Sequence, residues 1–89
     1  MPTISMFYGI LVMMYFKDID HHQSPHIHVE YQDFNAVLRI PDGELLSGNL
    51  PPKKLKMVQV WMIIHEEELL ADWKLAVRGE PTFKIEPLR

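Results

Sequence analysis

Residues 24–31, which read SPHIHVEY, decide the fold because polar and apolar side chains alternate along them. A period of two is typical of a half-buried strand, since successive side chains point to opposite faces of a sheet. The alternation predicts that the side facing the core carries Ile27, Val29 and Tyr31. It predicts that the opposite, exposed face carries His26, His28 and Glu30. This polar face indicates a functional site, although it identifies no substrate by itself.

The segments on either side of this strand predict an antiparallel meander. Residues 6–16, MFYGILVMMYF, are rich in β-branched and aromatic side chains. They are expected to form one long strand, in which Gly9 marks a bulge or a close backbone approach. After a turn at residues 32–33, residues 34–40 are expected to return as a hairpin strand. Pro41-Asp42-Gly43 has turn chemistry, and residues 44–47 are expected to add a short strand.

The periodicity then changes to that of helices. Pro51 and Pro52 suit a helix start, and residues 53–64 are apolar nearly all round. A break is expected near His65, and a second helix is expected to end before Gly79. Residues 83–86 alternate again and are expected to add an edge strand. The prediction is an α+β fold in a single domain over residues 1–89: an antiparallel sheet of three to five strands packed against two C-terminal helices.

The composition narrows the functional classes. The chain has 89 residues and a net charge of −3, which argues against generic DNA coating because that role needs an excess of lysine and arginine. It has no cysteine, which excludes disulfides and thiolate metal sites and agrees with a reducing cytoplasm. The apolar residues 6–16 are too few to span a bilayer, which takes about 20 residues. We therefore expect a cytoplasmic protein without a membrane segment.

Several motifs follow one another along almost the whole chain. They are Pro2-Thr3-Ile4-Ser5 with Phe7-Tyr8-Gly9-Ile10, Pro25-His26-Ile27-His28-Val29-Glu30-Tyr31, Leu50-Pro51-Pro52, His65 followed by Glu67-Glu68-Leu69-Leu70 and Trp73, and Lys84-Ile85-Glu86-Pro87-Leu88. In this order they resemble the small bacterial and archaeal proteins of the domain of unknown function 4160 family. The chain departs from that pattern at Ile27, where an aromatic residue is more usual, and at Met13-Met14, where a polar or basic residue is common.

The resemblance implies that the chain is one component of a two-gene unit. Members of this family are often encoded beside a small protein of the domain of unknown function 2442 family, which makes such a protein the expected partner. The resemblance further implies a toxin–antitoxin-like or regulatory system. It supplies no catalytic residue that transfers to this sequence, so the hypotheses about the site rest on the chemistry of the residues.

The first hypothesis is a histidine-dependent ribonuclease-type toxin. Cleavage beside a ribose 2′-hydroxyl needs a base, an acid and positive charge near the phosphate, and histidine suits both proton roles near neutral pH. His26, His28 and Glu30 are the candidate catalytic residues on the exposed face. The candidates for phosphate or nucleic-acid binding are Lys53, Lys54 and Lys56 at the start of the first helix. Lysines at a helix start interact unfavourably with the helix dipole, and a bound phosphate would reverse this cost. The alternative is that the lysines of this first turn face solvent.

The second hypothesis is a metal site. His26 and His28, with His21 and His22, offer nitrogen ligands for Zn²⁺, Ni²⁺ or Fe²⁺. Oxygen ligands would come from Asp18, Asp20 or Glu30. No third ligand is fixed by a diagnostic spacing, so a divalent metal is an alternative and no cofactor is assigned.

The third hypothesis is a non-catalytic module that binds and regulates a DNA-binding protein. Residues 53–64 and 6–16 are apolar on more faces than a monomer of 89 residues is expected to bury. A partner protein would cover this surplus, and a homodimer would do the same. In this interpretation His26 and His28 form hydrogen bonds within the fold or contact the partner.

Overall fold

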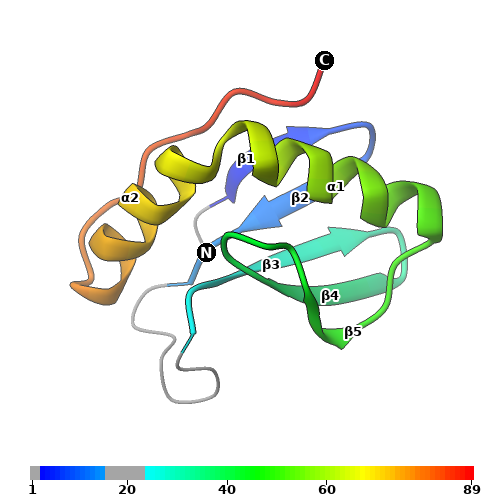
Figure 1. Ribbon diagram of the computed structural model, residues 1–89, viewed down its shortest axis with the longest axis horizontal. Coiled ribbons are helices and arrows are strands. Elements are labelled where there is room, and N and C mark those ends of the chain that lie inside the picture. Colours follow the sequence, from blue (N-terminus) through cyan, green and yellow to red (C-terminus); the bar gives the residue numbers. More distant parts are fainter. Residues whose placement is uncertain (1–2, 16–23) are drawn as a thin grey trace.

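The computed structural model describes residues 3–15 and 24–89, and these form one antiparallel sheet and two helices (Figure 1). The five strands lie in the sheet in the order of the sequence, and each is antiparallel to the next. The elements are β1 Thr3–Phe7, β2 Ile10–Met13, β3 His26–Tyr31, β4 Phe34–Arg39, β5 Leu45–Gly48, α1 Pro52–Ile64 and α2 Glu66–Val77. The predicted α+β fold, with a sheet preceding two C-terminal helices, is confirmed.

The single long strand expected over residues 6–16 is wrong, because the chain turns back at Tyr8 and Gly9 between β1 and β2. These two residues have φ angles of 50° and 78°. Positive φ at both central residues is the geometry of a tight turn that matches the twist of the flanking strands. Gly9 also lies close to Tyr31, since a Cβ placed on it would come within 3.3 Å of that ring. Residue 16 lies outside the described part of the chain.

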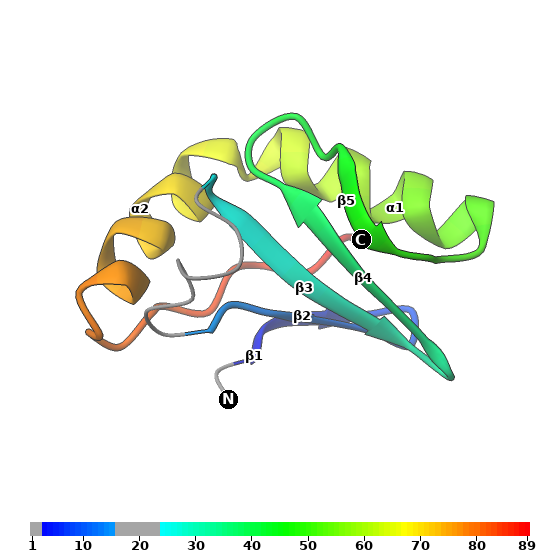
Figure 2. The same ribbon diagram turned by 90° about the horizontal axis from the view of Figure 1, so that it is seen from below.

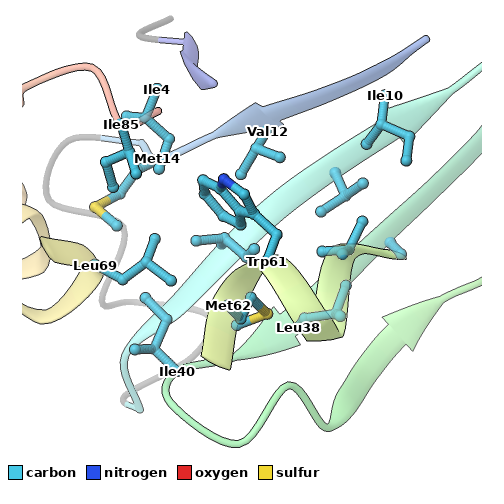
Figure 3. Close-up of a cluster of buried hydrophobic side chains, with 14 of the residues drawn as sticks. Ile4, Ile10, Val12, Met14, Leu38, Ile40, Trp61, Met62, Leu69 and Ile85 are labelled. Atoms are coloured by element: carbon cyan, nitrogen blue, oxygen red, sulfur yellow. The ribbon is translucent and has the colours of Figure 1, made fainter. Parts of the chain in front are cut away.

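One face of the twisted sheet packs against α1 and holds the core (Figures 1 and 2). Trp61 and Met62 of α1 point toward the sheet, where they meet Val12 and Leu38 (Figure 3). Trp61 is fully buried, and its ring centroid lies 5.4 Å from that of Phe7 in β1. The helix therefore contributes its largest side chain to the centre of the core.

β3 places its apolar residues in this core much as its alternation predicts. Ile27 and Val29 are buried. Tyr31 is half-buried and packs at the edge of the core, with the Lys54 ammonium 4.8 Å from its ring centroid. A cation over an aromatic ring is favourable. The end of β3 is thus closed by the first turn of α1.

The helical layer breaks at His65, as predicted. The His65 N–H donates to the Trp61 carbonyl at 3.0 Å, and the His65 carbonyl accepts the Leu69 N–H at the same distance, so one residue ends α1 and begins α2. Its Nδ1 lies 2.6 Å from Oε1 of Glu68. α2 then runs beside the start of β3 (Figures 1 and 2). Within the described residues, no helix is long and apolar enough to cross a bilayer.

The edge strand expected at residues 83–86 is wrong: the segment is extended but forms no strand. The Ile85 N–H donates to the Ile4 carbonyl of β1 at 2.7 Å. The neighbouring backbone groups bond to side chains of the helices instead of a sheet ladder. The Glu86 carbonyl accepts Trp61 Nε1–H at 2.7 Å, and the Phe83 N–H donates to Asp72 Oδ1 at 2.9 Å. This C-terminal segment therefore ties the helices to β1.

Asp72 is a buried carboxyl group in α2, and its Oδ2 atom has no hydrogen-bond partner. Burial raises the pKa of Asp72 above its ordinary value; the hydrogen bond from the Phe83 amide lowers that pKa, and the charge of Glu68 raises it further. The folded state therefore binds a proton at Asp72 more tightly than the unfolded state does. Stability is consequently gained as pH falls through the raised pKa toward the ordinary carboxyl pKa of about 4.

We predict that Asp72→Asn removes this part of the pH dependence. The asparagine keeps an oxygen for the Phe83 N–H but carries no charge to bury. The free energy of unfolding of the wild type should rise relative to that of the variant as pH falls from 7 to 4, as measured by urea unfolding. Glu66→Gln, at an exposed carboxyl in the same helix, is the control. A wild-type-to-Asp72→Asn difference that stays constant across this range would contradict the prediction.

Candidate functional site

The face of the sheet opposite α1, here called the open face, consists of two rows of side chains that run across the strands. The first row is Met6, Leu11, Glu30 and Asn35. The second row is Met13, His28, Val37 and Ser47. Both rows mix polar and apolar side chains, whereas a solvated antiparallel face is ordinarily polar. On the open face, His28 and Glu30 are the residues of the histidine motif that are in part accessible to solvent.

His28 lies half-buried at the centre of the second row. Its ring meets that of Tyr15 edge to face, with the centroids 4.1 Å apart. A shallow depression of about 140 Å³ lies beside it, and its polar lining includes Glu30, Asn35 and Ser47. This volume is smaller than the roughly 300–1,000 Å³ of typical small-molecule pockets. The depression suits the contact of a small polar group more than the enclosure of a nucleotide.

His26 is buried, with only 1% of its surface exposed, which corrects the prediction of an exposed position. The sequence alternation places it on the same side as His28, and the two ring centroids are 5.3 Å apart. Its other neighbour is Trp73 of α2, with ring centroids 4.9 Å apart. The helix covers His26 because α2 passes the start of β3 (Figure 2).

The tautomer of His26 follows from its hydrogen bond. Its Nδ1 lies 2.7 Å from the Ser24 carbonyl oxygen. A carbonyl can only accept, so Nδ1 carries the hydrogen and donates it. This bond fixes the plane of the ring against both Trp73 and His28. His26 therefore acts as a rigid support on which the His28 ring rests.

Arg39 lies opposite His26 in the register of β3 and β4. Its guanidinium binds Asp42 through two nitrogens, with Nε at 3.1 Å from Oδ1 and a terminal nitrogen at 2.5 Å from Oδ2, and it also contacts Glu44. The hydrogen bond from Arg39 lowers the pKa of Asp42. Arg39 thus stabilises the turn after β4, and its charge is compensated there.

The three lysines proposed to bind phosphate lie away from the histidines. Lys54 donates to the Tyr8 carbonyl at 3.2 Å, and its ammonium lies over the Tyr31 ring. Lys54 therefore lies at the far end of β3, on the side of the sheet that α1 covers. Tyr31 is three residues beyond His28, which corresponds to about 10 Å along a strand. Lys53 and Lys56 are exposed on α1. The structure therefore does not bring these lysines together with His26 and His28.

The metal-site prediction falls largely outside the described residues. His21, His22, Asp18 and Asp20 all lie outside the described residues. Across residues 3–15 and 24–89, no group of three histidine or carboxylate side chains is placed to hold a metal ion. His26, His28 and Glu30 do not form such a group by themselves, and the metal site stays a prediction.

Sequence reasoning missed three residues that surround the histidines. Tyr15 and Trp73 contact His28 and His26, and Asn35 lies opposite Glu30. The turn at residues 32–33 fixes the pairing of residues 30 and 35, so the position of Asn35 was available from the hairpin register. Trp73 had no such signal, because its contact depends on how α2 crosses the end of the sheet.

A family model described as a domain of unknown function, DUF4160, matches residues 9–74. The matched region includes β2 to β5, α1 and most of α2, and therefore both histidines of the strand. Comparisons with curated proteins and with solved structures found no match.

We predict that the two histidines differ in their importance for stability. His26→Ala removes a buried ring and its hydrogen bond, which should lower the free energy of unfolding by about 2–4 kcal/mol. His28→Ala removes a half-buried ring at the surface and should cost less than about 1 kcal/mol. Urea unfolding followed by circular dichroism measures both. Equal losses in the two variants would contradict the support role of His26.

Proposed function

Because the chain belongs to the domain of unknown function 4160 family, whose description assigns no activity, we propose its role from its geometry: it is a non-catalytic binding module of a two-gene regulatory unit. The observation that carries this proposal is the mixed surface of the open face. Met6 is 64% exposed there, and Leu11 and Val37 are half-buried beside His28 and Glu30. Apolar residues with a few oriented polar groups are typical of protein-binding surfaces.

The positions of the charged and titratable groups favour binding over catalysis. An acid–base pair must reach the substrate, and His26 is covered by Trp73. The lysines that would neutralise a phosphate lie at the other end of β3. In the proposed role, His28 and Glu30 provide polar contacts to a partner, and His26 holds His28 in place.

The proposed partner is the co-encoded protein, which the family resemblance suggests is of the domain of unknown function 2442 type. Its matching surface would carry apolar side chains together with hydrogen-bond donors for Glu30. If the partner binds DNA, this chain would regulate it by covering or orienting its DNA-binding surface.

Replacing Met6 and Leu11 by lysine is expected to weaken this interaction by at least about tenfold, because the two charges would be buried in the interface. The measurement is titration calorimetry with the purified co-encoded protein. Phe83→Lys adds a charge at a site that is 73% exposed and lies beside α2, outside the two rows of the open face, and should bind as the wild type does. Wild-type affinity in the Met6→Lys/Leu11→Lys variant, or no binding by the wild type, would contradict the proposal.

A ribonuclease-type toxin is the second candidate, favoured by the contact between the His26 and His28 rings beside a polar depression. In that case induced expression should arrest growth, and His28→Ala should abolish both the arrest and the cleavage of RNA by the purified protein. His28→Ala is the informative variant because the loss of His26 also affects folding. Growth arrest by both the wild type and His28→Ala, or by neither of them, would exclude a catalytic role for His28.

A further inference from the structure

The side of α1 that faces away from the sheet, here called the outer stripe, carries charged and apolar side chains that are exposed to solvent. Along this stripe lie, at helical spacing, Lys53, Lys56, Val60, Ile63 and Ile64. The lysines are exposed, and the three apolar side chains are 48%, 71% and 61% exposed. Positions three and four residues apart share one face of a helix. The stripe therefore presents a basic end followed by an apolar centre.

The stripe continues into an acidic end at the start of α2. Glu66, Glu67 and Glu68 line a depression of about 340 Å³ together with Ile63 and Ile64. Glu68 is bound to His65, while Glu66 and Glu67 have no ion pair within the described residues. The surface as a whole runs from positive, through apolar, to negative.

This order is unfavourable for α1 in isolation. Its first turn contains Lys53 and Lys54 and no acidic residue, and its last turn has no basic residue. Cations near the positive end of the helix dipole are destabilising, and the negative end of α1 has no compensating cation. α2 has the usual arrangement, with three glutamates in its first turn and Lys74 in its last.

A second copy of the same stripe, placed antiparallel, sets the basic end of each copy against the acidic end of the other. With Val60 on the twofold axis, residues 53 and 67 are equally far from it along the chain, so Lys53 of one copy meets Glu67 of the other, twice. Val60 then meets Val60 of the other copy, Ile63 lies opposite Met57, Ile64 lies opposite Lys56, and the two helix dipoles oppose. Such self-complementarity is the condition for a closed twofold dimer. A helix of 13 residues gives a stripe of about 20 Å.

We propose that the protein is a homodimer in which α1 packs antiparallel against α1 of a second copy, with Val60, Ile63 and Ile64 at the centre and the lysine and glutamate ends paired across it. An interface built on one helix is smaller than the standard of about 800 Å² per partner, which places it among the weak or transient contacts. The open face lies on the other side of the sheet and stays accessible in this dimer.

Sedimentation equilibrium over a range from micromolar to millimolar protein tests the proposal. Wild type should dimerise, and Ile63→Ser should raise the dissociation constant at least tenfold. The Met6→Lys/Leu11→Lys variant changes apolar residues on the open face and should dimerise as the wild type does. A wild type that is monomeric throughout, or a dimer that Ile63→Ser leaves intact, would overturn the proposal.

Charge reversal tests the antiparallel pairing itself. Lys53→Glu alone and Glu67→Lys alone should each weaken the dimer, because each places like charges opposite each other. The double variant Lys53→Glu/Glu67→Lys restores opposite charges in both symmetric pairs and should recover most of the wild-type affinity. Added salt should weaken the wild type and the double variant alike. A double variant weaker than both single variants would overturn the antiparallel arrangement.

The test of the homodimer can be distinguished from the test of partner binding by the open face, which is the proposed function. The monomeric Ile63→Ser variant should still bind the co-encoded protein, since its open face is unchanged. Loss of partner binding in this variant, together with loss of the dimer, would leave the homodimer standing and would overturn the assignment of the open face as the surface that binds the co-encoded protein.

Discussion

The burial of Trp61 is the interaction on which the rest of the structure depends. Its ring contacts Phe7 of β1, and its Nε1–H donates to the Glu86 carbonyl of the C-terminal segment. One side chain of α1 therefore joins the helix, the first strand and the end of the chain. A domain of this size buries only about 60–65% of the surface that its unfolded chain exposes, so its core is thin. In such a core the position of one large ring fixes the position of the helix.

The position of α1 in turn decides which surfaces remain for function. Trp61 and Met62 are directed into the sheet. Each residue of an α-helix is rotated by about 100° from the one before it, so the next two residues, Ile63 and Ile64, point outward. The break at His65 then redirects the chain so that Trp73 of α2 reaches His26. The burial of His26 and the exposure of the outer stripe of α1 are thus consequences of the same packing.

The sequence was sufficient for the architecture because its signals are local. The alternation in residues 24–31, the turn at Pro41-Asp42-Gly43 and the break at His65 each depend on a few adjacent residues. The prediction failed at Gly9, where a turn glycine and a bulge glycine look alike within an apolar run. It also failed at residues 83–86, whose backbone bonds to side chains distant in sequence.

The candidate site was less accessible to sequence reasoning for the same physical reason. Alternation placed His26 and His28 on one side of β3, and their rings do touch. Exposure, however, depends on what covers a strand from outside, and the cover of His26 comes from Trp73, 47 residues further along the chain. The distance of Lys54 from the histidines likewise depends on where α1 begins over the sheet.

The order of the strands has a consequence for how the chain folds during synthesis. Each strand pairs with the one made just before it, so the sheet can assemble progressively as it leaves the ribosome, with short loops to close. Its apolar face, however, stays uncovered until Trp61 and Met62 emerge, and β1 waits longer still for Ile85. A sheet that formed before these residues emerge would have an uncovered apolar face, the condition in which edge strands pair with other chains. The last third of the sequence therefore covers the apolar face that the first two thirds build.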